Sequence, residues 1–131
     1  MKKSKAWFNS LSGEIIDASI EVHRELGPGL LESVYEHCLE FELVTRGFQV
    51  KRQFPIPVVY KGERLNKDFF IDLLVENEII IELKCVEKMI PVHEVQLLTY
   101  LPLADKKLGL LLNFNVNLMR EGIKRKINGD L

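Results

Sequence analysis

The stretch FFIDLLVENEIIIELKCV, residues 69–86, decides the fold. It consists of two strongly apolar runs, residues 69–75 and 79–86, joined by the polar segment Glu76-Asn77-Glu78. Short apolar runs on either side of a turn are typical of paired strands, and we expect them at the centre of a sheet. If the turn is centred on Asn77, antiparallel pairing joins residues whose numbers sum to 154 (2 × 77).

Three charged side chains interrupt these runs. Asp72 is the only charged residue in the first run, and Glu82 and Lys84 are the only ones in the second. Under the pairing rule Asp72 faces Glu82, and Lys84 shares the face of Glu82 because strand side chains alternate. Directly opposed carboxylates lie with their Cβ atoms about 4.5–5.5 Å apart and repel each other. A shared divalent cation removes this conflict. A salt bridge from Lys84 to either acid on a solvent-facing surface is the alternative.

A helical hairpin is predicted upstream of this stretch. Glycine favours a helix C-terminus and proline cannot continue a helix, so Gly27-Pro28-Gly29 ends the first helix and separates it from the second. The apolar positions of the second helix recur at three- and four-residue spacing. The first helix is expected from Ile15 to about Leu26, with Ser12 near its start, and the second from Leu31 to near Gly47.

Two strands are expected after the helices, over residues 48–54 and 56–60, because the first alternates apolar with polar residues and the second is rich in β-branched residues. Pro55 and Pro57 predict an edge strand or a break between the two. Lys61-Gly62-Glu63 is expected to form a turn before the central hairpin.

The last third of the chain completes an α/β pattern. A third helix is predicted to begin at Pro91, with Val92, Val95, Leu98 and Leu101 on its apolar side. Residues 108–114 read as a short buried strand, and residues 116–127 fit either a strand or a helix. We therefore expect a central mixed β-sheet with flanking helices and an N-terminal helical hairpin.

Three motifs together resemble a known superfamily. Asp72 followed by Glu82-Leu83-Lys84 is similar to the D-x(n)-E-x-K signature of the PD-(D/E)XK nucleases, although Ile71 precedes Asp72 where the name implies proline. Gln96 and Tyr100 resemble the Q-x-x-x-Y element of its exonuclease and recombination branch; a surface residue beside a packed tyrosine is the alternative. Gly29, Glu32 and Tyr35 resemble the motif of the GxxExxY family. The resemblance implies one restriction-endonuclease-like domain over residues 1–131.

The resemblance also implies roles for individual residues. Asp72, Glu82, Lys84 and Gln96 are the expected catalytic residues, and Asp72, Glu82 and Glu32 the expected ligands of Mg²⁺ or Mn²⁺. Glu32 is equally explained as part of a solvated helix face, because Glu32, Glu36 and Glu40 recur every four residues. Gln96, Tyr100 and His93 are the candidates for substrate binding; His93 precedes Gln96 by about one helical turn.

Two functions from different classes follow. The first is a metal-dependent phosphodiesterase that attacks nucleic acid, by resemblance DNA, with water activated by the metal. The second is a catalytically silent nuclease-fold module that binds or regulates and acts with a partner. A third possibility is that the domain works as a homodimer or beside a protein partner, because 131 residues leave little surface beyond the cleft for gripping a long duplex.

Composition limits the partners. The 131 residues include 18 Lys and Arg against 19 Asp and Glu, so the net charge of −1 provides no overall attraction for nucleic acid. Two local basic stretches, within residues 51–67 and 106–126, are either solvated faces or contact sites. Cys38 and Cys85 are expected as buried free thiols. No apolar run approaches the ~18 residues of a membrane span, so we expect a soluble cytoplasmic protein that does not act on membranes.

Overall fold

The computed structural model describes residues 2–131 and has the predicted α/β architecture. Its elements are α1 (Lys5–Leu26), α2 (Glu32–Thr45), β1 (Val50–Tyr60), β2 (Glu63–Val75), β3 (Ile79–Lys84), α3 (Pro91–Leu103), β4 (Leu108–Asn113), the short 3₁₀ helix η1 (Met119–Gly122) and β5 (Ile123–Ile127). The five strands form one sheet in the order β1-β2-β3-β4-β5. Only β3 and β4 pair in parallel, so the sheet is mixed as expected.

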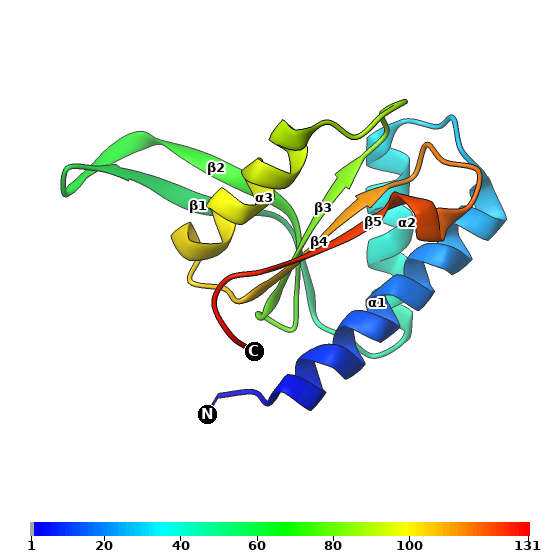
Figure 1. Cartoon of the computed structure of the whole chain (residues 1–131), viewed down its shortest axis with the longest axis horizontal. Coiled ribbons are helices and arrows are strands. Elements are labelled where there is room, and N and C mark those ends of the chain that lie inside the picture. Colours follow the sequence, from blue (N-terminus) through cyan, green and yellow to red (C-terminus); the bar gives the residue numbers. More distant parts are fainter. Residues whose placement is uncertain (1) are drawn as a thin grey trace.

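The helical hairpin covers one face of the sheet (Figure 1). The prediction for the start of α1 was wrong: the helix begins ten residues before Ile15, with the Ser4 side chain capping it by accepting from the Trp7 N–H at 3.0 Å. Phe8 and Leu11 extend the apolar stripe of the helix and are buried against the sheet. This burial offsets the weak helix propensity of the serine- and glycine-containing first turns.

Helix α3 packs on the opposite face, and of the four residues predicted on its apolar side only Leu101 is buried there. Val92, Val95 and Leu98 are 58%, 55% and 43% exposed, whereas Leu97 and Leu101 are fully buried. The reason lies in β4, where Gly109 has no side chain: a Cβ atom there would lie 2.7 Å from Leu97 Cδ1. The helix therefore turns Leu97 into the space that glycine leaves.

The first two strands form a hairpin that extends beyond the body of the molecule (Figure 1, green). The predicted edge position was correct, since β1 ends the sheet, but Pro55 and Pro57 do not divide it. Both prolines lie opposite β2 residues within one strand, and the register shifts only between Pro57 and Val59. The first half of β2 was not predicted, because residues 63–67 are exposed and, apart from Leu65, polar.

The central hairpin has the predicted register. Leu73 pairs with Ile81, Leu74 with Ile80 and Val75 with Ile79, and each pair sums to 154. Glu76 and Asn77 have φ values of 52° and 57°, which suit a tight turn that follows the twist of the strands.

The remaining predictions have mixed outcomes. Residues 108–113 form the buried strand β4, and the ambiguous segment contains both η1 and β5. Cys38 and Cys85 are free thiols, half-buried rather than buried. Within residues 2–131, no helix is long and apolar enough to cross a membrane.

Candidate active site

The site is built where β2 and β3 separate. Their ladder ends at the pair Leu73 and Ile81, one step before Asp72 and Glu82. Beyond this pair, a side chain of β2 bonds to the main chain of β3: Asp72 Oδ2 accepts a hydrogen bond from the Leu83 N–H at 2.8 Å. Ile71 and Leu74 both pack beneath α3, although strict alternation would place them on opposite faces. Asp72 therefore lies at a local twist of β2 that opens the sheet.

Glu82 lies in this opening with little access to water. The residue is 6% exposed, and its Oε1 atom is buried without a hydrogen-bond partner among the described residues. Burial and, to a lesser extent, the nearby Asp72 carboxylate together raise the pKa of Glu82 to about 9, against the opposing effect of the Lys84 ammonium. A buried, partnerless carboxylate oxygen beside a second carboxylate is a donor set that fits a hard divalent cation.

Lys84 contacts Gln96 of α3, and Tyr100 of the same helix contacts Gln96. Lys84 Nζ lies 3.5 Å from Gln96 Oε1, and Gln96 Nε2 donates to the Tyr100 hydroxyl at 3.0 Å. Burial raises the pKa of Tyr100, and the nearby carboxylates of Glu82 and Asp72 also raise it. The structure thus brings the predicted residues Gln96 and Tyr100 to the same place as the three charged residues of the sheet.

Glu32 lies near these groups without joining them closely. It begins α2, and partial burial raises its pKa, as does the Asp72 carboxylate, while Lys84 lowers it. Among residues 2–131, however, no three side chains of His, Cys, Asp or Glu are gathered tightly enough to hold a metal ion by themselves. Glu32 as a third ligand therefore stays a prediction, and the assembled part of the site is the pair Asp72 and Glu82.

Sequence reasoning missed two residues that contact Asp72 or its partners. Glu36 is buried, 6% exposed, which contradicts the solvated helix face inferred from its spacing. Gln53 Nε2 lies 2.7 Å from Glu36 Oε1 and 3.3 Å from Asp72 Oδ1, so it joins the two carboxylates. The register places Gln53 opposite Asp72, and its φ of 53° is in the left-handed region that few non-glycine residues adopt. No pattern in the sequence marks this backbone conformation of Gln53.

His93 has a local structural role. Its Nδ1 accepts from the Ile90 N–H at 3.3 Å, which closes the start of α3. Only Nε2 then remains available for a phosphate contact, so that role stays a prediction.

The motif Gly29-x-x-Glu32-x-x-Tyr35 has a physical explanation in the turn before α2. Gly29 has a φ of 99°, which favours glycine. The fully buried Tyr35 donates its hydroxyl proton to the Gly27 carbonyl at 2.5 Å and accepts from the Leu30 N–H at 3.1 Å. Tyr35 therefore fixes the loop that positions Glu32.

The mixed sheet, its opened central hairpin and the Asp, Glu and Lys side chains at the opening define a restriction-endonuclease-like fold of the nuclease type. A family model described as the PD-(D/E)XK nuclease superfamily matches residues 9–126. The chain belongs to this superfamily, whose members usually use divalent metal ions. No curated protein and no solved structure matches the chain. That the chain belongs to the GxxExxY family within this superfamily stays a prediction.

Proposed function

We propose that this chain is a metal-dependent phosphodiesterase that cleaves nucleic acid, with DNA as its substrate and Mg²⁺ or Mn²⁺ as its cofactor. The observation that carries the proposal is the buried, partnerless Oε1 of Glu82 beside the Asp72 carboxylate. A fold that leaves such an oxygen unsatisfied incurs a free-energy cost unless a ligand pairs with it.

The cation would be held by Asp72, Glu82 and the Leu83 carbonyl. A strand residue directs its N–H and C=O to the same side, and the Leu83 N–H bonds to Asp72, so the carbonyl lies on the Asp72 side of β3. Mg²⁺ commonly takes one or two protein carboxylates and keeps several waters, so two carboxylates suffice, and Glu32 is the candidate third ligand. A bound cation polarises the scissile phosphate and lowers the pKa of water.

The other residues position groups and offset charge. Lys84 would orient the attacking water and stabilise charge that develops on the phosphate, as positioned cations do. Gln96 holds the Lys84 ammonium and Tyr100 holds Gln96, so both limit where that ammonium can move. Either residue would also bind the substrate backbone. Gln53 donates to Asp72 and to Glu36, so these two residues also help to position the Asp72 carboxylate.

The test is a cleavage assay with purified protein. Single-stranded, double-stranded and branched DNA and RNA are incubated with Mg²⁺ or Mn²⁺, and products are resolved by length. Lys84→Ala and Asp72→Asn are each expected to lower the rate by roughly 10²-fold or more, the usual loss when a group that stabilises transition-state charge is removed. Lys88→Ala removes an exposed lysine of the loop between β3 and α3 and is expected to leave the rate unchanged. Undiminished cleavage by Lys84→Ala would refute the assignment.

A silent binding module is the second candidate. The observation that favours it is that no three acidic, histidine or cysteine side chains within residues 2–131 are assembled for a metal. It predicts that the wild-type protein binds nucleic acid with an affinity that Asp72→Asn does not change, and that no substrate in the panel is cut with either metal. Cleavage that depends on Asp72 would exclude this candidate.

A further inference from the structure

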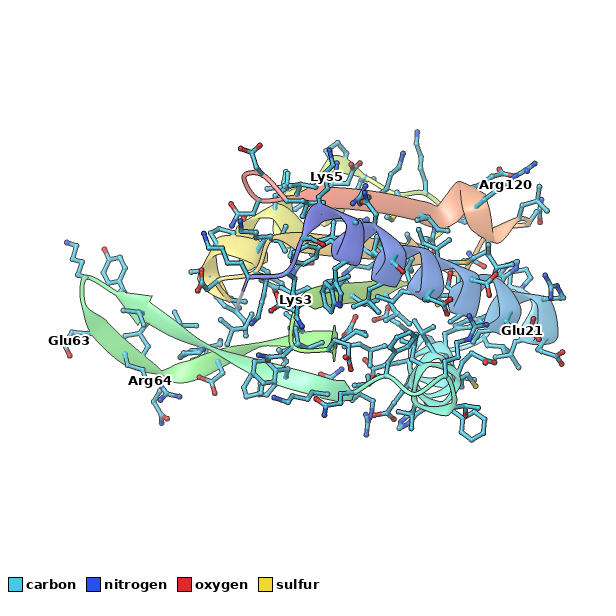
Figure 2. All side chains as sticks on the ribbon, turned by 90° about the horizontal axis from the view of Figure 1, so that it is seen from below. Lys3, Lys5, Glu21, Glu63, Arg64 and Arg120 are labelled. Carbon is cyan, nitrogen blue, oxygen red and sulfur yellow. The ribbon has the colours of Figure 1, made fainter. Side chains whose placement is uncertain are left out.

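The β1–β2 hairpin contains an arm, residues 50–71, that runs from the start of β1 to the residue before Asp72. Figures 1 and 2 show it leaving the body of the molecule, with Glu63 and Arg64 at its tip. Near its base, Ile56, Phe69 and Ile71 pack beneath α3. Beyond Ile56 most of its residues are exposed on both faces. A two-stranded ribbon that no other element covers is only marginally stable in water. Because the protein gains little stability from so long a ribbon, we look for a binding role.

The arm is positively charged on a negatively charged protein. Its residues include five Lys and Arg against two Asp and Glu, a net charge of +3, so the rest of the chain, with 13 against 17, has −4. Lys61, Arg64 and Lys67 lie on its outer half, where Lys61 Nζ also lies 5.4 Å from the centre of the Tyr60 ring. With this distribution of charge, the arm attracts a polyanion, whereas the protein as a whole does not.

Large apolar side chains accompany these charges. Val59, Tyr60 and Leu65 are 57%, 62% and 44% exposed, and none of them contributes to either buried cluster of the described residues. A polyanion bound by charge alone needs no such residues. Apolar and aromatic side chains between cations suit base edges, where a thymine methyl group offers an apolar contact.

The arm starts at the candidate active site. Asp72 follows its last residue, and Gln53 of β1 contacts Asp72. Asp72 lies ten residue steps after Gly62 at the turn (72 − 62), and at ~3.3 Å per step these span about 33 Å. This is close to one turn of B-form DNA, about 34 Å. The major groove of B-form DNA, about 12 Å wide, admits a two-stranded β-ribbon, whereas that of A-form RNA is too narrow.

We propose that the arm lies in the major groove of a DNA duplex and holds it against the site at Asp72 and Glu82. The inference rests on the proposed function and deepens it, because it names double-stranded DNA as the ligand. The groove has a phosphate strand along each wall, so cations on both faces of the ribbon can reach phosphates.

The experiment measures binding of fluorescent DNA duplexes of about 10 and 20 base pairs to the full chain, in Ca²⁺ and at several salt concentrations. The arm variant is the triple change Lys61→Glu, Arg64→Glu and Lys67→Glu. Its matched control is Lys2→Glu, Lys3→Glu and Lys5→Glu, which changes the net charge equally at exposed positions outside the arm; Figure 2 labels Lys3 and Lys5. Circular dichroism and thermal unfolding verify that both variants fold.

The wild type is expected to bind the longer duplex more tightly than the shorter one. In the arm variant this gain disappears, and affinity for the longer duplex falls by roughly tenfold or more at low salt. The slope of log affinity against log salt falls by about 0.9 for each lost phosphate contact, about 2.7 for three. The control keeps the wild-type slope and length dependence.

Three outcomes overturn the inference, and they separate it from the proposed function. If the arm variant binds and cleaves duplex DNA like the wild type, the arm is not a DNA contact, while the nuclease proposal stands. If the wild type is a dimer in sedimentation and the arm variant a monomer with unchanged DNA affinity, the arm is a subunit interface. If the wild type neither binds nor cleaves any nucleic acid, both proposals fail.

Discussion

Replacing Glu82 by glutamine tests the electrostatics of the site without any substrate. The substitution keeps the shape of the side chain and removes its titration. Burial raises the pKa of Glu82 to about 9 in the folded protein, against 4.5 for an ordinary glutamate. Between these values the folded protein holds a proton that the unfolded chain has released. Unfolding therefore releases a proton, and rising pH favours the unfolded state.

The size of this effect follows from linkage. Each pH unit between the two pKa values changes the free energy of unfolding by about 1.36 kcal/mol for one proton. From pH 5 to pH 8 the wild type is expected to lose up to about 4 kcal/mol through Glu82 alone. Water that reaches the carboxylate reduces the loss, so we expect a change of about 2–4 kcal/mol. The stability that the protonated Glu82 provides is fully present below about pH 4.5, and it is lost as pH rises towards 9.

The assay is urea unfolding of the wild type and Glu82→Gln at pH 5, 6, 7 and 8 in a metal chelator. The difference between the two free energies of unfolding cancels the titrating groups that do not interact with Glu82, and it should shift in favour of Glu82→Gln by that amount as pH rises. Glu25→Gln makes the same chemical change at an exposed residue of α1 and serves as the control. A difference between wild type and Glu82→Gln that stays constant with pH would refute the reasoning.

Two further substitutions test the elements that support the site. Tyr35→Phe leaves the Gly27 carbonyl and the Leu30 N–H without their partner, so we expect a loss of about 2 kcal/mol in urea unfolding; unchanged stability would show that water replaces the hydroxyl. Gly109→Ala places a Cβ atom 2.7 Å from Leu97 Cδ1, and overpacking of this kind costs about 1–3 kcal/mol. Thermal unfolding measures that loss, and an equal melting temperature would mean that α3 moves away freely.

The central hairpin could be predicted from the sequence because its determinants are local. Two apolar runs and a three-residue turn establish which residues pair, and the observed ladder has the expected sum of 154. The same locality explains why the end of α1 was predicted correctly and why an edge strand was one of the two alternatives predicted for β1. Proline and glycine act on their own backbone, so their effects can be read without knowledge of the fold.

The environment of each side chain depended on distant elements. The spacing of Glu32, Glu36 and Glu40 describes one helix face, but only the approach of β1 shows that Glu36 is buried against Gln53. In the same way, α3 leaves Val92, Val95 and Leu98 exposed because Gly109 of β4 makes room for Leu97.

The sequence by itself determined the hairpin, its register and the presence of two acids and a lysine at its end, because pairing and alternation are properties of neighbouring residues. Only the tertiary structure decided that β2 and β3 separate at Asp72 and that Glu82 Oε1 is buried without a protein partner. Burial and electric field are sums over residues far apart in the chain, so they exist only once the sheet and both helical layers are assembled.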